Sequence, residues 1–242
     1  MPRCQRTFKS LGEGVVTPGG GGARRWTCPY CPDSEVYETV TDTDLLSYAA
    51  LALSACERDF GPPHDRSRTA LLLLGLRPEC VLEPADRRYD LYLQSGSDPF
   101  QLRLQIGHEM FHRVCSRGRI FHWTHEMLAC LCAVRLLRRC GAEEYAEETV
   151  RRYGNAAHEL TVTEMMTLDL WAAPAHSAGF YGRAFVTGVE LEQAVGWPAL
   201  CRLARCLDST GAPDISTWLS LLPANARSDC QRILGITMGN EK

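Results

Sequence analysis

Two histidines with a glutamate between them are the residues of this sequence best suited to metal chemistry. They lie in His108-Glu109-Met110-Phe111-His112, which has the pattern HExxH. Residues i and i+4 of a helix project from the same face, so both imidazoles can bind one zinc ion. Glu109 follows the first histidine and can take a proton from a water whose pKa the metal lowers toward about 7. The motif therefore predicts metal-assisted hydrolysis.

The residues around the motif predict the helix that this chemistry requires. Asp98-Pro99 supplies a capping carboxylate and a proline in the first turn. We expect a helix over 100–116, and a buried core helix with two hydrogen-bonded histidines is the alternative without a metal. The apolar residues that favour burial on most sides of this helix are Phe100, Leu102, Leu104, Ile106, Met110, Phe111 and Val114.

Two histidines alone make a weak zinc site, so a third ligand is required. A histidine six residues after the second is excluded because Gly118 occupies that position. Glu126 is the preferred ligand, because it opens the next predicted helix, 124–140, among apolar residues that would pack against the first. His122 and His125 are rival ligands. A carboxylate stabilised by the helix dipole is the alternative explanation of Glu126.

The remaining elements predict an α+β fold. Apolar residues recur at helical spacing after Thr43, and alternation after Arg88 is typical of a strand. Glutamates and arginines after Gly141 predict a solvated helix face with ion pairs. The expected elements are a helix over 43–60, strands over 69–74 and 88–93, the helices 100–116 and 124–140, and helices over 142–158, 161–170, 180–195, 198–208, 214–222 and 224–234.

Residues 1–40 differ from the rest and are expected to form a disordered or loosely docked tail. A glycine run follows Pro18, and Cys28 and Cys31 form a CxxC pair that suits half of a zinc ribbon or a redox dithiol. Only Cys4 lies near enough in sequence to add a ligand. Its segment Met1-Pro-Arg-Cys4 resembles the prosegment of matrix metallopeptidases, where a thiolate blocks the open zinc position. We divide the chain into this tail, a catalytic core over 41–140 and a helical subdomain over 141–242.

The composition argues against several classes of partner. The net charge is −3, and 45% of the residues are hydrophobic, as in ordinary globular proteins. No nucleic-acid partner is expected from this charge. The longest apolar runs are too short to span a bilayer, and no signal peptide is recognised, so no membrane partner is expected. Twelve scattered cysteines favour a reduced, cytoplasmic compartment in which buried thiols act as small hydrophobic groups.

The two predicted zinc helices resemble those of the gluzincin zinc metallopeptidases in their small "peptidase MA-like" form. In that family a segment of the type Trp-x-x-Glu-Gly-x-Ala follows HExxH. Trp123, Glu126 and Ala129 match this segment, and Met127 replaces its glycine. The resemblance covers about residues 41–235 and is specific at the zinc helices.

The resemblance implies a minimal thermolysin-like fold, in which a small mixed sheet packs on the zinc helices before a mainly helical C-terminal subdomain. It implies one catalytic zinc held by His108, His112 and Glu126, with Glu109 as general base. Tyr181, in a segment similar to the family's tyrosine-bearing helix, would donate a hydrogen bond to the tetrahedral oxyanion.

Three further expectations follow from the resemblance. The strand 88–93 would be an edge strand that aligns an extended peptide. Thermolysin relatives carry an acid four residues after the third ligand, which orients a zinc histidine, and Cys130 stands there in this chain. We therefore expect the orienting group to come from elsewhere. His176 is the rival of Tyr181 as oxyanion donor.

A zinc metallopeptidase with a peptide or protein substrate is the predicted function. Two alternatives stay open. One is a regulatory HExxH protein of the repressor-cleaving type, with a single substrate and a partner that triggers cleavage. The other is a non-catalytic gluzincin-like scaffold that binds zinc, against which the intact Glu109 argues.

Overall fold

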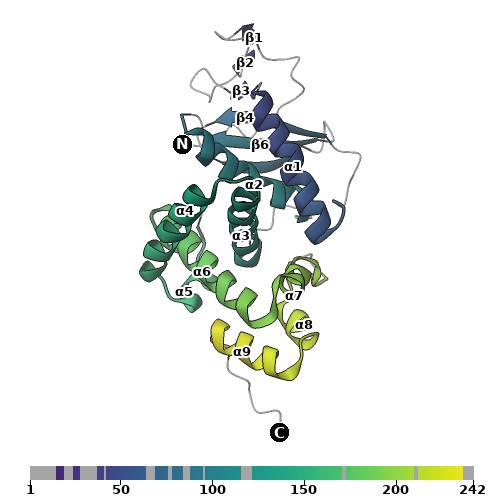
Figure 1. Cartoon of the computed structure of the whole chain (residues 1–242), viewed down its shortest axis with the longest axis vertical. Helices are drawn as coiled ribbons and strands as arrows, with labels where there is room; N and C mark the ends of the chain where they lie inside the picture. Colours follow the sequence, from purple (N-terminus) through teal and green to yellow (C-terminus); the bar gives the residue numbers. More distant parts are fainter. Residues whose placement is uncertain are drawn as a thin grey trace.

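A sheet lies at one end of the molecule and a group of helices at the other (Figure 1). The computed structural model describes residues 15–18, 24–27, 37–40, 42–63, 69–75, 78–83, 88–94, 96–115, 122–170, 173–209 and 212–236. This arrangement of a mixed sheet with many helices is compatible with the predicted α+β class. No helix of these ranges is long and apolar enough to cross a bilayer.

The sheet has the strand order β1-β2-β3-β4-β6-β5. The expected strands are present as β4 (Thr69–Gly75) and β6 (Arg88–Gln94), which pair in parallel. A strand that we did not predict, β5 (Glu79–Glu83), pairs antiparallel with β6 on its other side. The expectation that 88–93 is an edge strand is therefore wrong, because β5 occupies that edge.

The described part of the segment 1–40 contains three short strands, where we expected a disordered or loosely docked tail. They are β1 (Val15–Pro18), β2 (Arg24–Thr27) and β3 (Tyr37–Thr39), joined as an antiparallel series. β3 pairs antiparallel with β4, so the sheet continues from the predicted core into this segment.

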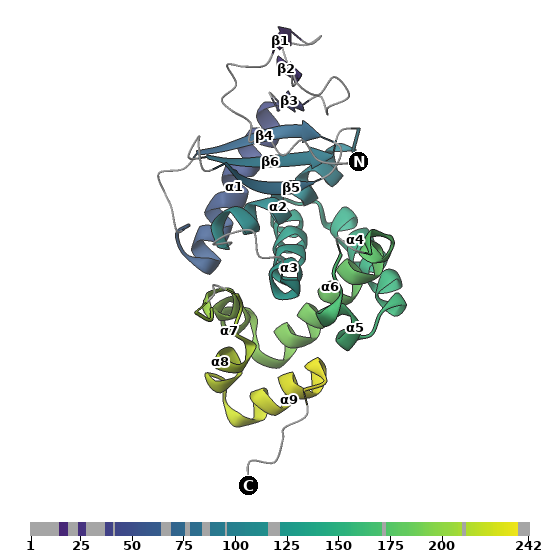
Figure 2. The same cartoon turned by 180° about the vertical axis from the view of Figure 1, so that it is seen from behind.

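Three helices build the centre of the molecule, and their ends agree with the predicted ends within one residue. They are α1 (Thr43–Phe60), α2 (Pro99–Cys115) and α3 (Trp123–Arg139). The side chain of Asp42 accepts hydrogen bonds from two amides of the first turn of α1. Asp98 caps α2 in the predicted way, through the amides of the second and third helical residues. α1 and α2 lie on one face of the sheet, in front of it in Figure 1 and behind it in Figure 2.

One buried side chain fixes the position of α2 relative to the sheet. Gln105 is only 4% exposed, and its Oε1 accepts a hydrogen bond of 2.8 Å from the backbone amide of Gln94 at the end of β6. Its Nε2 donates to the hydroxyl of Ser97 at 3.4 Å. The helix that carries HExxH is thus attached to β6, the strand next to the edge strand β5, through a polar contact inside the core.

The C-terminal part is helical, and its longest helix crosses beneath α3 (Figure 2). This helix, α6, packs against α3 and α4. It begins three residues before the predicted start, so Tyr181 lies within its first turns. The elements are α4 (Glu143–Ala156), η1 (Ala157–Glu159), α5 (Val162–Thr167), η2 (Pro174–His176), α6 (Ser177–Val195), α7 (Trp197–Cys201), η3 (Arg202–Arg205), α8 (Ile215–Ser220) and α9 (Ala224–Leu234).

A glycine permits the close approach of the two central helices. A Cβ atom added at Gly107 would lie 2.9 Å from the Cα of Ala133 and 3.3 Å from its Cβ. Such a contact is too short for any residue with a side chain, so α2 and α3 can pack at this distance only because position 107 has none. Gly107 directly precedes His108, so this contact controls the separation of the helices at the histidine motif.

We predict that Gly107→Ala destabilises the protein, although alanine ordinarily favours a helix over glycine by about 1 kcal/mol. The added methyl group must push α2 away from α3, and overpacking of this kind costs about 1–3 kcal/mol. Gly154→Ala is the control, because its Cβ would meet nothing within 4 Å. Urea unfolding of both variants measures the difference. Equal or higher stability of Gly107→Ala would contradict the close approach.

Candidate metal centre

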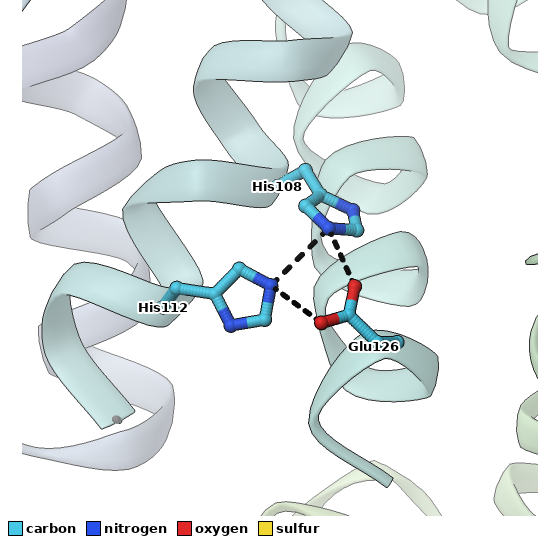
Figure 3. Close-up of side chains that lie close together, drawn as sticks. All are labelled: His108, His112 and Glu126. Carbon is cyan, nitrogen blue, oxygen red and sulfur yellow. Dashed lines mark hydrogen bonds and ion pairs between the residues drawn. The ribbon is translucent and has the colours of Figure 1, made fainter. Parts of the chain in front are cut away.

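α2 and α3 bring together the three residues that the sequence selects as metal ligands (Figure 3). His108 and His112 lie one turn apart on α2, and Glu126 lies in the first turn of α3. The donor atoms of the three residues all lie within 4.8 Å of one another. No other group of three or more potential ligands meets this condition in the described part of the chain.

The donor separations fit one small ion. The Nε2 atoms of the two histidines are 3.2 Å apart. Glu126 Oε2 is 3.1 Å from Nε2 of His108, and its Oε1 is 3.4 Å from Nε2 of His112. A tetrahedral ion with bonds of about 2.0–2.1 Å has ligands about 3.3–3.4 Å apart. The two contacts of Glu126 use different oxygens of its carboxylate, so the side chains surround a position for one ion at distances close to those of a tetrahedral site; with one donor atom per residue, the separations stay within 4.8 Å.

The start of α3 is fixed by a capping histidine. The Nδ1 of His122 accepts a hydrogen bond from the backbone amide of Thr124 and lies 2.8 Å from the hydroxyl of the same residue. This cap sets the first turn of α3, which carries Glu126. His122 therefore has a structural role. It does not belong to the ligand group, although the rival interpretation made it a ligand.

The second rival ligand, His125, also lies outside the group. Its ring packs edge-on against Phe111 at a centroid distance of 6.0 Å. Burial, with the nearby His112 and His122, lowers the pKa of His125 to about 4, so its ring is neutral at physiological pH.

The site electrostatics favour a carboxylate beside cationic groups. Burial alone would raise the pKa of Glu126, but His112 and His108 outweigh it and hold this pKa well below the ordinary value. Burial alone would lower the pKa of His108, whereas contacts with Cys130 and Glu126 raise it well above the ordinary value. Without a metal, the centre therefore favours a protonated His108 paired with an ionised Glu126.

The two predicted catalytic residues lie next to this centre. Glu109 is 5% exposed on α2, directly after His108. The ring of Tyr181 lies edge-on to the ring of His108 at a centroid distance of 5.9 Å. α6 thus brings a phenol to the metal centre from a distant part of the sequence. The rival donor, His176, is exposed in η2.

A residue that sequence reasoning set aside also touches the centre. Cys130 Sγ lies 3.8 Å from Nδ1 of His108. We expected the orienting group to come from elsewhere, whereas the residue four positions after Glu126 itself contacts this imidazole. The i, i+4 spacing from Glu126 was the available signal, since it places both side chains on one face of α3.

The CxxC pair of Cys28 and Cys31, which suits half of a zinc ribbon or a redox dithiol, lies outside the described residues, as does Cys4. Comparisons with protein-family models, with curated proteins and with solved structures found no match for this chain. The function must therefore be argued from the centre itself.

We predict that the protein binds one divalent ion, with zinc as the probe, and that the affinity falls as pH falls. A metal needs the free Nε2 atoms of both histidines, and the raised pKa of His108 makes protons compete above the ordinary histidine range of about 6.5. Competition with a chromophoric chelator between pH 6 and 9 measures this. His108→Ala should lose the site, and the exposed His158→Ala should not. Unchanged zinc content in His108→Ala would exclude this centre.

Proposed function

We propose that this chain is a zinc-dependent metallopeptidase of the gluzincin type. The observation that carries the proposal is the convergence of His108, His112 and Glu126 at the spacing of a tetrahedral metal site. Nitrogen donors and one carboxylate suit zinc, and three protein ligands leave a fourth position open, which is typical of catalytic rather than structural zinc.

The residues around the ligands support hydrolysis rather than metal storage. When bound, zinc lowers the pKa of a coordinated water to about 7 and polarises a carbonyl oxygen. Glu109 accepts the proton of the attacking water and passes it to the leaving amine. Tyr181 donates a hydrogen bond to the oxygen on which negative charge develops. Each residue belongs to a helix packed at the centre, so neither role needs a mobile loop.

The sheet supports an extended peptide as substrate. β5 pairs on one side only in the described sheet, and it packs next to α2. An edge strand offers backbone amides and carbonyls that can pair with a peptide. We assign the aligning role to β5, in place of the internal β6. The order of helix, strands, two ligand helices and helical subdomain also supports a minimal thermolysin-like arrangement.

We predict that Glu109→Gln abolishes peptide hydrolysis while the fold and the bound zinc are retained. The amide has nearly the shape of the carboxylate but cannot accept the proton of the water. Mass spectrometry of a mixed peptide library, with zinc content measured in parallel, tests this. The exposed Glu144→Gln is the control.

Two outcomes would count against the proposal. Cleavage by Glu109→Gln at the wild-type rate would remove the general-base assignment. Absence of cleavage by a zinc-loaded wild-type protein would favour the non-catalytic scaffold.

We predict that Tyr181→Phe lowers kcat by about 10²–10³-fold, with little change in KM, because a hydrogen bond made in the transition state is lost. Tyr145→Phe is a matched control. The hydroxyl of Tyr145 donates to Gln101 at 2.7 Å, so its loss should affect stability but not kcat. A normal kcat in Tyr181→Phe with a low kcat in His176→Ala would transfer the role to the histidine.

A further inference from the structure

One face of α3 contacts both nitrogens of the same imidazole. Glu126 and Cys130 lie one turn apart, so they face α2 together. Glu126 Oε2 is 3.1 Å from Nε2 of His108, and Cys130 Sγ is 3.8 Å from Nδ1. His108 is therefore held on its metal side by the carboxylate and on its far side by the thiol.

We propose that Cys130 is a positioning residue for the metal, whose sulfur accepts the Nδ1–H of His108 and selects the tautomer with Nε2 free for the ion. A neutral imidazole carries one proton, so a histidine that binds metal through Nε2 must carry this proton on Nδ1. That N–H needs an acceptor, and the second partner normally fixes the orientation of the ring. The inference rests on the metal centre of the proposed function but not on peptidase activity.

The surroundings of the thiol prevent water from taking over its role. Cys130 is 0% exposed. Tyr153, from α4, lies beside it: burial raises the pKa of Tyr153 well above its ordinary value, and the neighbouring Cys130 raises it further. Because Cys130 is fully covered by protein, loss of its sulfur would leave the Nδ1–H of His108 buried without an acceptor, which is costly.

A thiol holds the histidine more weakly than a carboxylate would. Sulfur is a weak acceptor, and 3.8 Å is a long contact. Loss of an outer partner of a metal-bound histidine typically weakens metal affinity or activity by about 10–100-fold. We expect Cys130 to contribute near the lower end of this range.

The test compares two buried cysteines of the same helix. Cys130→Val keeps an apolar side chain of similar size but removes the acceptor, and Cys132→Val makes the same change at a site that does not contact His108. Zinc dissociation constants are measured with a chromophoric chelator, in reductant and without any substrate. We expect about tenfold weaker binding in Cys130→Val and wild-type binding in Cys132→Val.

The outcomes separate this inference from the proposed function. Wild-type affinity in Cys130→Val, or equal losses in both variants, overturns the positioning role. A wild-type protein that binds no zinc overturns both this role and the metal centre. A zinc-loaded protein that cleaves no peptide contradicts the peptidase alone, and the comparison of the two cysteines still decides the role of Cys130.

A measurement on the wild-type protein covers the case in which Cys130→Val does not fold. In zinc-loaded protein with ¹⁵N-labelled histidine, the Nδ1–H of His108 should exchange slowly with solvent, because the sulfur accepts it in a site that water does not reach. The resonance is assigned by its loss in His108→Ala. Fast exchange of this proton would overturn the proposal.

Discussion

The separation of α2 and α3 is the constraint on which the metal centre depends. Two histidines on one helix and a glutamate on the other reach a common point only when the two backbones lie close together. Metal sites tolerate deviations of about 0.2 Å in their bond lengths. Gly107 and Ala133 meet one residue away from the first ligand, His108. The two helices therefore carry a glycine and an alanine at the point where the distance between their backbones sets the positions of the ligands.

Burial of acidic groups is the second demand that the centre must meet. Glu126 and Glu109 are 8% and 5% exposed, and a buried carboxylate is costly unless it is paired. For Glu126 the histidines supply this pairing when no metal is present, as the opposite pKa shifts of His108 and Glu126 indicate. A bound cation would replace the proton of His108 as the positive charge beside Glu126. The same residues can therefore be stable with and without a metal.

Helical periodicity and capping predicted the three central helices. Asp98 and the apolar pattern around HExxH placed α2 within one residue of its observed ends, because these signals are local. Four of the six described strands were not predicted: β1, β2 and β3 in the segment 1–40, and β5, since a five-residue strand after Pro78 has too few residues for a periodic pattern. The edge position of β6 was expected only from the family resemblance, and the antiparallel pairing of β5 with β6 overturns it.

In the candidate site, too, residues placed by local spacing could be predicted and residues placed by packing between elements could not. His108, His112 and Glu126 could be predicted because spacing on two successive helices determines which side chains meet. The position of Tyr181 beside His108 was expected only through a family resemblance, and the contact of Cys130 with His108 was not expected. Both contacts depend on packing between elements rather than on a local pattern. For position 130, the sequence analysis considered only an acidic residue as a group that could orient a histidine.

The order of the site residues along the chain has a consequence for folding. His108 and Glu126 come from consecutive helices, so the ligand group depends on contacts of short sequence separation, whose loop-closure cost is smaller than that of distant contacts. Tyr181 comes from α6 and Tyr153, which lies beside Cys130, comes from α4. Both reach the centre only after these later helices have docked. For the proposed zinc protein, α2 and α3 alone would supply all three ligands, and a bound ion would join the two helices before α4 and α6 pack against α3.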